Sequence, residues 1–141
     1  MLIFVQNLST MKKVVFLLSI IVFSAVACQS QNTSKETAAT AKSEVLSVAD
    51  FKTKTSDSKV QLVDVRTPEE YVQGHIDEAL NINVLADNFS TEIQKMDKTK
   101  PVYIYCRSGS RSARAAKAMQ ELGFKEIYDL KGGYLAWSAQ Q

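Results

Sequence analysis

The stretch C-R-S-G-S-R, residues 106–111, places a lone cysteine in front of two arginines with small residues between them. The chain contains four arginines, and three of them, Arg107, Arg111 and Arg114, fall within eight residues of one another. A guanidinium group binds anions through a planar fork of N–H donors, and the thiolate is the nucleophilic form of cysteine. The spacing therefore predicts a sulfur nucleophile beside an anion-binding loop.

The elements on either side of this loop decide how its groups are presented. Residues 102–105, V-Y-I-Y, predict a buried strand, and a helix is expected to begin near Ser110 or Arg111. Cys106 would then lie at the carboxyl end of a strand and face a helix N-terminus, where open α/β sheets bind their ligands. Gly109 lets the backbone turn with its N–H groups directed inward. These N–H groups, the helix dipole and the guanidinium groups are together expected to lower the pKa of Cys106.

The N-terminus is typical of an export signal. Lys12 and Lys13 precede the apolar run V-V-F-L-L-S-I-I-V-F-S-A-V-A, which ends at Cys28 and is shorter than the roughly 20 residues that span a bilayer. The ending A-V-A-C resembles the lipobox of bacterial lipoproteins, in which the cysteine becomes the acylated N-terminus. We therefore predict a lipoprotein-type signal peptide over residues 1–28, with Met11 as an alternative start. A plain secretory cut after Ala27, an uncleaved anchor and a buried core helix are the competing interpretations.

Residues 29–42 are rich in Ser, Thr, Gln, Lys and Ala and are typical of a flexible tether. Behind a lipidated Cys28 such a tether would hold an exported domain, residues 43–141, at a membrane of the periplasm or cell envelope. Two of the 17 Lys and Arg residues lie in the predicted signal, and the other 15 balance the 15 Asp and Glu residues. This balance gives no support to a nucleic-acid partner, so we expect membrane attachment through the lipid alone.

Cys106 has structural interpretations besides the chemical one. A lone cysteine is most often a small buried side chain, and a disulfide with Cys28 is a further alternative. An unpaired thiol in an exported protein is exposed to oxidation, and a polar loop between arginines is a poor place to bury a hydrophobe. The stretch 98–120 contains six basic and no acidic residues, which is also compatible with a solvated basic helix face.

Predicted strands and helices alternate along residues 43–141, which indicates an α/β fold with a largely parallel sheet. Thr67-Pro68-Glu69-Glu70 is the clearest helix start, with Thr67 as the N-cap and Glu70 completing a capping box. Strands are expected over residues 44–46, 60–65, 79–82, 102–105 and 127–128, and helices after Ser47 and Thr67, within 85–96, up to Leu122 and over 134–139.

Four segments resemble the signatures of the rhodanese (sulfurtransferase) family, in order across the whole domain. They are L-V-D-V-R-T-P-E-E-Y at 62–71, G-H-I-D-E-A-L-N-I at 74–82, Y-C-R-S-G-S-R-S at 105–112 and L-K-G-G-Y-L-A-W at 130–137. The resemblance implies a rhodanese-like α/β fold, in which a largely parallel central sheet is covered by helices on both faces.

The resemblance also implies a chemistry. Cys106 would be the catalytic nucleophile and would carry sulfur as a persulfide, with no metal or organic cofactor. Sulfur would come from thiosulfate, a persulfide or a polysulfide and would pass to a thiol or cyanide. The loop would bind the oxyanion through its arginines and the persulfide through its N–H groups. The substrate-binding residues would thus be Arg107, Ser108, Gly109, Ser110 and Arg111.

Asp64 and Arg66, at the end of a predicted strand, are expected to support this loop. Asp64 would brace it from behind and Arg66 would pair with a carboxylate such as Glu70, with direct catalysis as the alternative. His75, the only histidine, is expected to belong to a structural turn rather than to act as a general base. Arg114 would either extend the basic patch or be solvated.

Two other functions remain as alternatives. A cysteine-dependent phosphatase or arsenate reductase combines a thiolate with an anion cradle, but its pattern has five residues between Cys and Arg where this chain has four, R-S-G-S. The smaller ring suits a sulfur atom better than a tetrahedral phosphate. A non-catalytic rhodanese-like binding module is the second alternative, although such modules generally lack the cysteine.

Overall fold

The computed structural model describes residues 41–57 and 59–141, and the predicted signal, Cys28 and nearly all of the predicted tether lie outside them. Strands and helices alternate in the described residues, as predicted, and β1 begins one residue before the predicted domain boundary. The strands are β1 (Lys42–Leu46), β2 (Gln61–Asp64), β3 (Leu80–Asn81), β4 (Val102–Tyr105) and β5 (Glu126–Leu130). The helices are α2 (Val48–Lys54), α3 (Pro68–Val72), α4 (Phe89–Ile93), α5 (Ser110–Glu121) and α6 (Gly133–Ser138).

The five strands form one parallel sheet in the order β1-β5-β4-β2-β3. β4 lies at its centre, with β2 on one side and β5 on the other, and all four of its residues are buried. This arrangement confirms the predicted α/β class. It also places the residue that follows β4, Cys106, at the middle of the carboxyl edge of the sheet.

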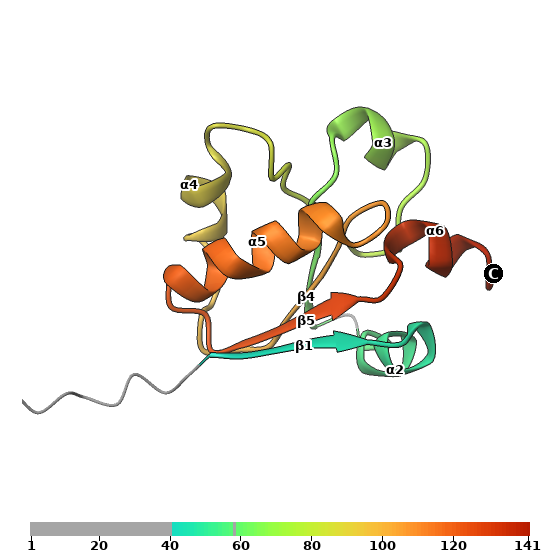
Figure 1. The fold of residues 1–141 in the computed structure, drawn as a ribbon, viewed down its shortest axis with the longest axis horizontal. Helices are drawn as coiled ribbons and strands as arrows, with labels where there is room; N and C mark the ends of the chain where they lie inside the picture. Colours follow the sequence, from blue (N-terminus) through green and yellow to red (C-terminus); the bar gives the residue numbers. More distant parts are fainter. Residues whose placement is uncertain (1–40, 58) are drawn as a thin grey trace, which may run out of the picture. The chain divides into compact units, whose positions relative to one another are not determined.

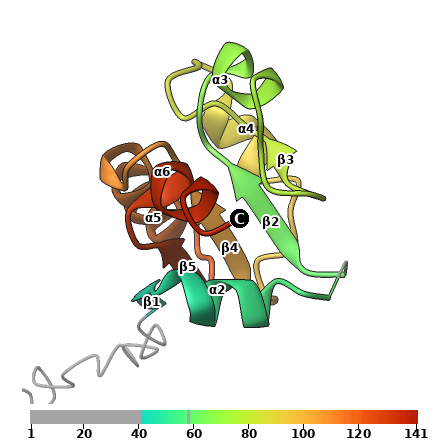
Figure 2. The same cartoon turned by 90° about the vertical axis from the view of Figure 1, so that its right-hand side faces the viewer.

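Helices cover both faces of the sheet. Neighbouring residues of a strand point to opposite faces, so each strand contributes side chains to both layers. Ile104 of β4 packs in a cluster with side chains of α4 and α5, whereas Tyr103 packs in a second cluster with side chains of α2 and α6. Figure 1 shows α5 above the strands and α2 below them, and Figure 2 shows α6 in front at the end where the strands stop. No helix within residues 41–57 and 59–141 is long and apolar enough to cross a membrane.

Local sequence signals fix the helix ends. Thr67 and Glu70 form the predicted capping box at the start of α3, and the Ser47 hydroxyl accepts a hydrogen bond from the N–H of Asp50 at the start of α2. α5 ends in a Schellman motif, in which Gly123 has a φ of +92° and the N–H of Phe124 donates to the carbonyl of Met119. Because α5 ends here, the chain turns after it and enters β5 within a few residues.

Candidate active site

Cys106 sits in the turn between β4 and α5 with only 1% of its surface exposed. It belongs to the apolar cluster beneath α5, so the expectation that its polar loop would keep this thiol out of the core is wrong. The loop residues Arg107 and Ser108 are exposed above it, so the sulfur lies at the floor of the loop rather than on its rim. A second sulfur bonded to it would extend about 2 Å from this floor into the loop.

The Cys106 sulfur accepts hydrogen bonds from neutral groups of its own loop and of α5. The N–H of Gly109 lies 3.1 Å from Sγ, and the Ser112 hydroxyl lies 3.5 Å from it. Burial opposes ionisation of the thiol, but hydrogen bonds from the Ser112 hydroxyl and from the N–H groups of Ser112, Ser108 and Gly109 outweigh it and lower the pKa of Cys106. The predicted lowering of the Cys106 pKa is therefore present, and hydrogen bonds are its largest cause.

The first turn of α6 holds the loop from outside. The N–H groups of Tyr134 and Leu135 donate to the carbonyls of Cys106 and Arg107, with N···O distances of 2.8 and 3.1 Å. In a trans peptide the carbonyl and the next N–H point in opposite directions. Because these two carbonyls are bound on the α6 side, the N–H groups of Arg107 and Ser108 point away from α6 and toward the inside of the loop.

This contact depends on Gly133. Its φ is +58°, and a Cβ built there would lie 2.7 Å from the Arg107 carbonyl oxygen and still closer to that of Cys106. Sequence reasoning treated Gly132-Gly133 only as a turn, although a repeated glycine in front of a helix also signals close approach of two backbones.

Arg111 is bound to a carboxylate. Its two terminal nitrogens lie 2.6 and 2.7 Å from the Glu70 carboxylate oxygens, a bidentate pair that joins α5 to α3. Hydrogen bonds from Arg111 lower the pKa of Glu70 to about 2. Arg66 pairs with a carboxylate as predicted, but this carboxylate is Asp64, whereas Glu70, the example given, is held by Arg111. Arg107 is exposed and takes part in none of the salt bridges found among the described residues.

Asp64 and Arg66 form a buried ion pair next to the loop. The Arg66 Nε lies 3.0 and 2.9 Å from the two Asp64 carboxylate oxygens, and its Nη2 donates to the Gly74 carbonyl. The Arg66 guanidinium also lies 4.2 Å from the centre of the Tyr134 ring. The pair therefore braces α6, which in turn holds the Cys106 loop.

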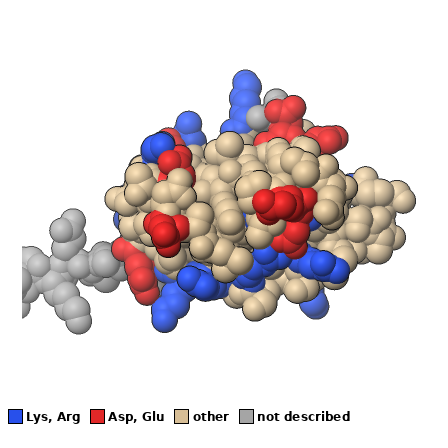
Figure 3. Space-filling model, turned by 90° about the horizontal axis from the view of Figure 1, so that it is seen from above, with Lys and Arg blue, Asp and Glu red and all other residues tan. Residues whose placement is uncertain are grey.

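The other predicted residues lie away from the sulfur. His75 is exposed, stacks on the Tyr71 ring and lines a cavity of about 450 Å³ together with Trp137. A second cavity of about 210 Å³ is lined by Arg107 and Tyr134 among others, so it adjoins the loop. Arg114 is exposed on α5, and Figure 3 shows Lys and Arg side chains gathered along the lower edge of that view.

Within the described ranges no three His, Cys, Asp or Glu side chains form a group that could hold a metal ion.

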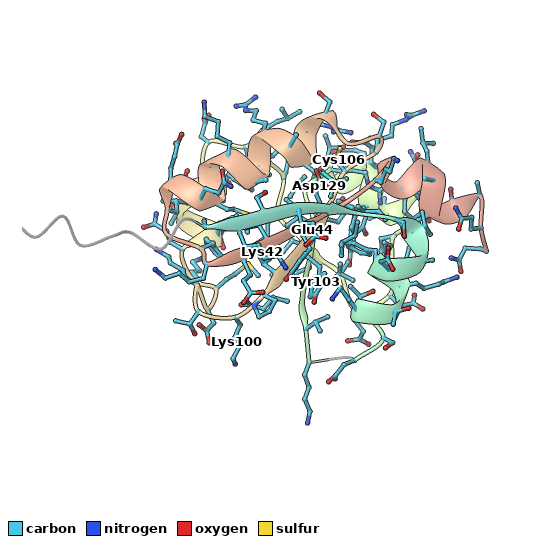
Figure 4. The ribbon with its side chains drawn as sticks, turned by 60° about the horizontal axis from the view of Figure 1, so that its bottom comes forward. Lys42, Glu44, Lys100, Tyr103, Cys106 and Asp129 are labelled. Carbon is cyan, nitrogen blue, oxygen red and sulfur yellow. The ribbon has the colours of Figure 1, made fainter. Side chains whose placement is uncertain are left out.

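Two residues that sequence reasoning missed lie behind the sulfur. Ser112, in the first turn of α5, is fully buried and contacts the Cys106 Sγ. Asp129 of β5 is 5% exposed, and one of its carboxylate oxygens has no hydrogen-bond partner among the described residues. In the view of Figure 4, the labelled Asp129 and Cys106 both lie near the start of α5. The signal for Asp129 was a carboxylate inside the apolar strand I-Y-D-L.

Comparisons with known proteins give one consistent result. The profile of the family described as "Rhodanese-like domain" matches residues 47–140. The thiosulfate sulfurtransferase GlpE of Shewanella oneidensis is 37% identical over 92 residues, which cover 65% of this chain and 89% of that protein. The uncharacterized protein YqhL of Bacillus subtilis is 42% identical over 82 residues, 58% of this chain and 64% of YqhL. The crystal structure of a rhodanese-like domain protein from Staphylococcus aureus is similar with a TM-score of 0.59 at 30% identity, covering 67% of this chain and 90% of that one.

Gly133→Ala tests how tightly α6 is seated on the loop. The added Cβ would overlap the Cys106 and Arg107 carbonyls, so we expect a loss of about 3 kcal/mol or more in the free energy of unfolding, measured in urea. Gly123→Ala is the matched control, because Gly123 also has a positive φ but has no atom within 4 Å of its would-be Cβ. We expect this control to lose only about 1 kcal/mol. Equal losses in the two variants would contradict the close contact.

Proposed function

The chain belongs to the rhodanese-like family, and on this basis we propose that it is a sulfurtransferase that carries sulfur on Cys106. The observation that carries the proposal is the convergence of hydrogen-bond donors on one buried sulfur with a lowered pKa. Such a site keeps a thiolate ready for attack and stabilises a second sulfur atom placed above it.

The proposed reaction has two steps, and in each step one bond to the transferred sulfur forms while another breaks. The Cys106 thiolate attacks the outer sulfur of a donor such as thiosulfate, the donor's S–S bond breaks, and sulfite leaves with the bonding pair. A cyanide or thiol acceptor then attacks the outer sulfur of the persulfide, and the Cys106 thiolate is the leaving group. The same N–H groups serve both steps, because the negative charge stays on sulfur inside the loop.

The size of the loop favours sulfur over phosphate as the group transferred. Only R-S-G-S separates Cys106 from Arg111, and the Gly109 N–H is already 3.1 Å from Sγ. A loop closed this tightly leaves room for one atom above the sulfur more readily than for a tetrahedral phosphate with three further oxygens.

Intact mass of the protein tests the proposal directly. After incubation with thiosulfate we expect a gain of one sulfur atom, which cyanide removes and which Cys106→Ser lacks. The control is hydrolysis of a generic aryl phosphate by the same sample. Phosphatase activity that requires Cys106, with no gain of sulfur, would replace the proposal with the phosphatase alternative. A folded protein with a free thiol and neither activity would favour the binding module.

We assign binding of an anionic donor chiefly to Arg107. Both arginines of the loop were expected to bind the anion, but Arg111 already shares its charge with Glu70, whereas Arg107 is exposed beside the cavity of about 210 Å³. A guanidinium held by a carboxylate attracts an incoming anion less strongly than one without an ionic partner.

Removing the charge of Arg107 and removing the charge of Glu70 should have opposite effects on the KM for thiosulfate. Arg107→Gln should raise the KM for thiosulfate by roughly five- to tenfold, because one charge-assisted contact is lost. Glu70→Gln should lower this KM, because it releases Arg111, while its amide can still complete the capping box with Thr67. Arg114→Gln is the matched control and should leave the KM unchanged. A KM that responds equally to Arg107→Gln and Arg114→Gln would show only general electrostatic attraction.

We further propose that the domain is exported and held at a membrane by lipid on Cys28. The support is the sequence of residues 11–28, which ends in A-V-A-C and is followed by a polar tether. In this location the donor and acceptor would be sulfur compounds of the periplasm or cell envelope.

Expression of the full chain in a bacterium tests this location. We expect the protein in the membrane fraction, with a mass that starts at Cys28 and includes lipid, and we expect Cys28→Ser to abolish that form. Cys106→Ser is the control and should remain lipidated. A soluble product that begins at an unmodified Cys28 would instead indicate a plain secretory cut.

A further inference from the structure

Ser112 is the one side chain within the described residues that donates a hydrogen bond to the Cys106 sulfur. It lies in the first turn of α5 and is fully buried, and its hydroxyl oxygen is 3.5 Å from Sγ. Cys106 is only 1% exposed, so solvent contributes little to the stability of a charge on its sulfur. The Ser112 hydroxyl supplies a hydrogen bond from within the fold instead.

The same hydroxyl has a second acceptor within reach. The Gly109 carbonyl oxygen lies 3.0 Å from the Ser112 oxygen. A serine hydroxyl carries one proton and rotates to suit its acceptors. Because a charged acceptor forms the stronger bond, the proton should turn to Sγ when the sulfur is a thiolate and to the carbonyl when the sulfur is neutral. The Gly109 N–H, 3.1 Å from Sγ, belongs to the backbone and has no such freedom.

The charge on Sγ changes twice in the proposed reaction. In the first step the Sγ thiolate attacks the donor, and the negative charge then lies on the outer sulfur of the persulfide. In the second step the acceptor attacks that outer sulfur, the S–S bond breaks, and the bonding pair returns to Sγ. Sγ is thus the nucleophile of one step and the leaving group of the next. The inward N–H groups of the loop face the outer sulfur, whereas the Ser112 hydroxyl contacts Sγ itself.

We propose that Ser112 stabilises negative charge on Sγ and thereby makes Cys106 a good leaving group when sulfur passes to the acceptor. In the persulfide its hydroxyl donates to the Gly109 carbonyl. As the S–S bond breaks, the hydroxyl turns and donates to the departing thiolate, and no proton is transferred. The inference rests on the proposed function, because Sγ becomes a leaving group only in a sulfur-transfer cycle.

The charged groups around the loop do not follow the charge on Sγ in this way. Each guanidinium that is paired is held by its own carboxylate, and a negative charge on a nearby carboxylate would oppose a thiolate rather than stabilise it. The groups concerned are the Arg111–Glu70 and Arg66–Asp64 pairs, the exposed Arg107, and Asp129, which is buried in β5. The hydrogen bonds that lower the pKa of Cys106 include that of the Ser112 hydroxyl, which agrees with this assignment.

Separate measurement of the two steps on the full chain tests the proposal. A more basic thiolate is a stronger nucleophile but a poorer leaving group. At a pH where Cys106 is fully ionised, Ser112→Ala should therefore take sulfur from thiosulfate at the unaltered rate or up to about threefold faster, and should release it to cyanide roughly three- to tenfold more slowly. Both rates are read from intact mass in single-turnover experiments. Ser90→Ala, in the first turn of α4, is the matched control and should change neither rate.

The pH dependence of Cys106 alkylation by iodoacetamide gives a second readout, which does not require sulfur transfer. Loss of the hydroxyl should raise the pH midpoint of alkylation, because the thiolate loses a hydrogen bond while its burial remains. Ser112→Thr keeps the hydroxyl and should preserve both the midpoint and the rate of release. Ser112→Val has nearly the same shape as Ser112→Thr without the hydroxyl and should behave as Ser112→Ala does, so the test does not depend on one variant.

Two results would overturn the proposal. One is an equal slowing of loading and release in Ser112→Ala, which would indicate a structural role, and the other is an unchanged midpoint of alkylation. An unaltered chain that forms no persulfide would refute the proposed function, and the midpoint alone would then decide whether Ser112 stabilises charge on Sγ.

Discussion

Two backbone hydrogen bonds from α6 to the Cys106 loop are the contact on which the site depends. The first N–H groups of a helix have no partner within the helix, and here the Cys106 and Arg107 carbonyls supply one. The pairing satisfies both sets of groups and turns the loop's own N–H groups inward. Gly133 is required because any side chain there would separate the two backbones. The buried Asp64–Arg66 pair supports the loop indirectly. Arg66 packs against the ring of Tyr134, the residue that follows Gly133 in α6.

The electrostatics of the loop come from dipoles more than from full charges. Neutral N–H and hydroxyl donors lower the pKa of Cys106, although burial acts in the opposite direction. Glu70 offsets the charge of Arg111, so the sulfur does not lie beside two unpaired guanidinium groups. Fixed dipoles need no rearrangement when charge moves from the cysteine to a persulfide and back. This property suits a site whose proposed task is to hold a negative sulfur in two alternating forms.

The sequence was informative wherever a short local pattern determines a structure. The V-Y-I-Y segment predicted β4, Thr67 with Glu70 predicted the start of α3, and the position of Cys106 at the carboxyl end of a strand was predicted from the segments on either side of it. Partners distant along the chain were not predictable in the same way. Glu70 lies 41 residues from Arg111, and nothing local distinguished this carboxylate's partner from Arg66. The burial of Cys106 was also missed, because a polar loop can still direct one side chain into the core beneath it.

Asp129 has a stability cost that follows from its shifted pKa. Its pKa of about 6 in the folded chain lies above the ordinary value of 3.8, so between these values the folded state binds more protons than the unfolded state. Stability from this group is therefore fully present below about pH 4 and is lost as pH rises through 6, by about 2–3 kcal/mol in all. An apolar residue would fit the surrounding cluster without this cost. The burial of Asp129 on the face of the sheet beneath α5 therefore lowers the free energy of unfolding at neutral pH.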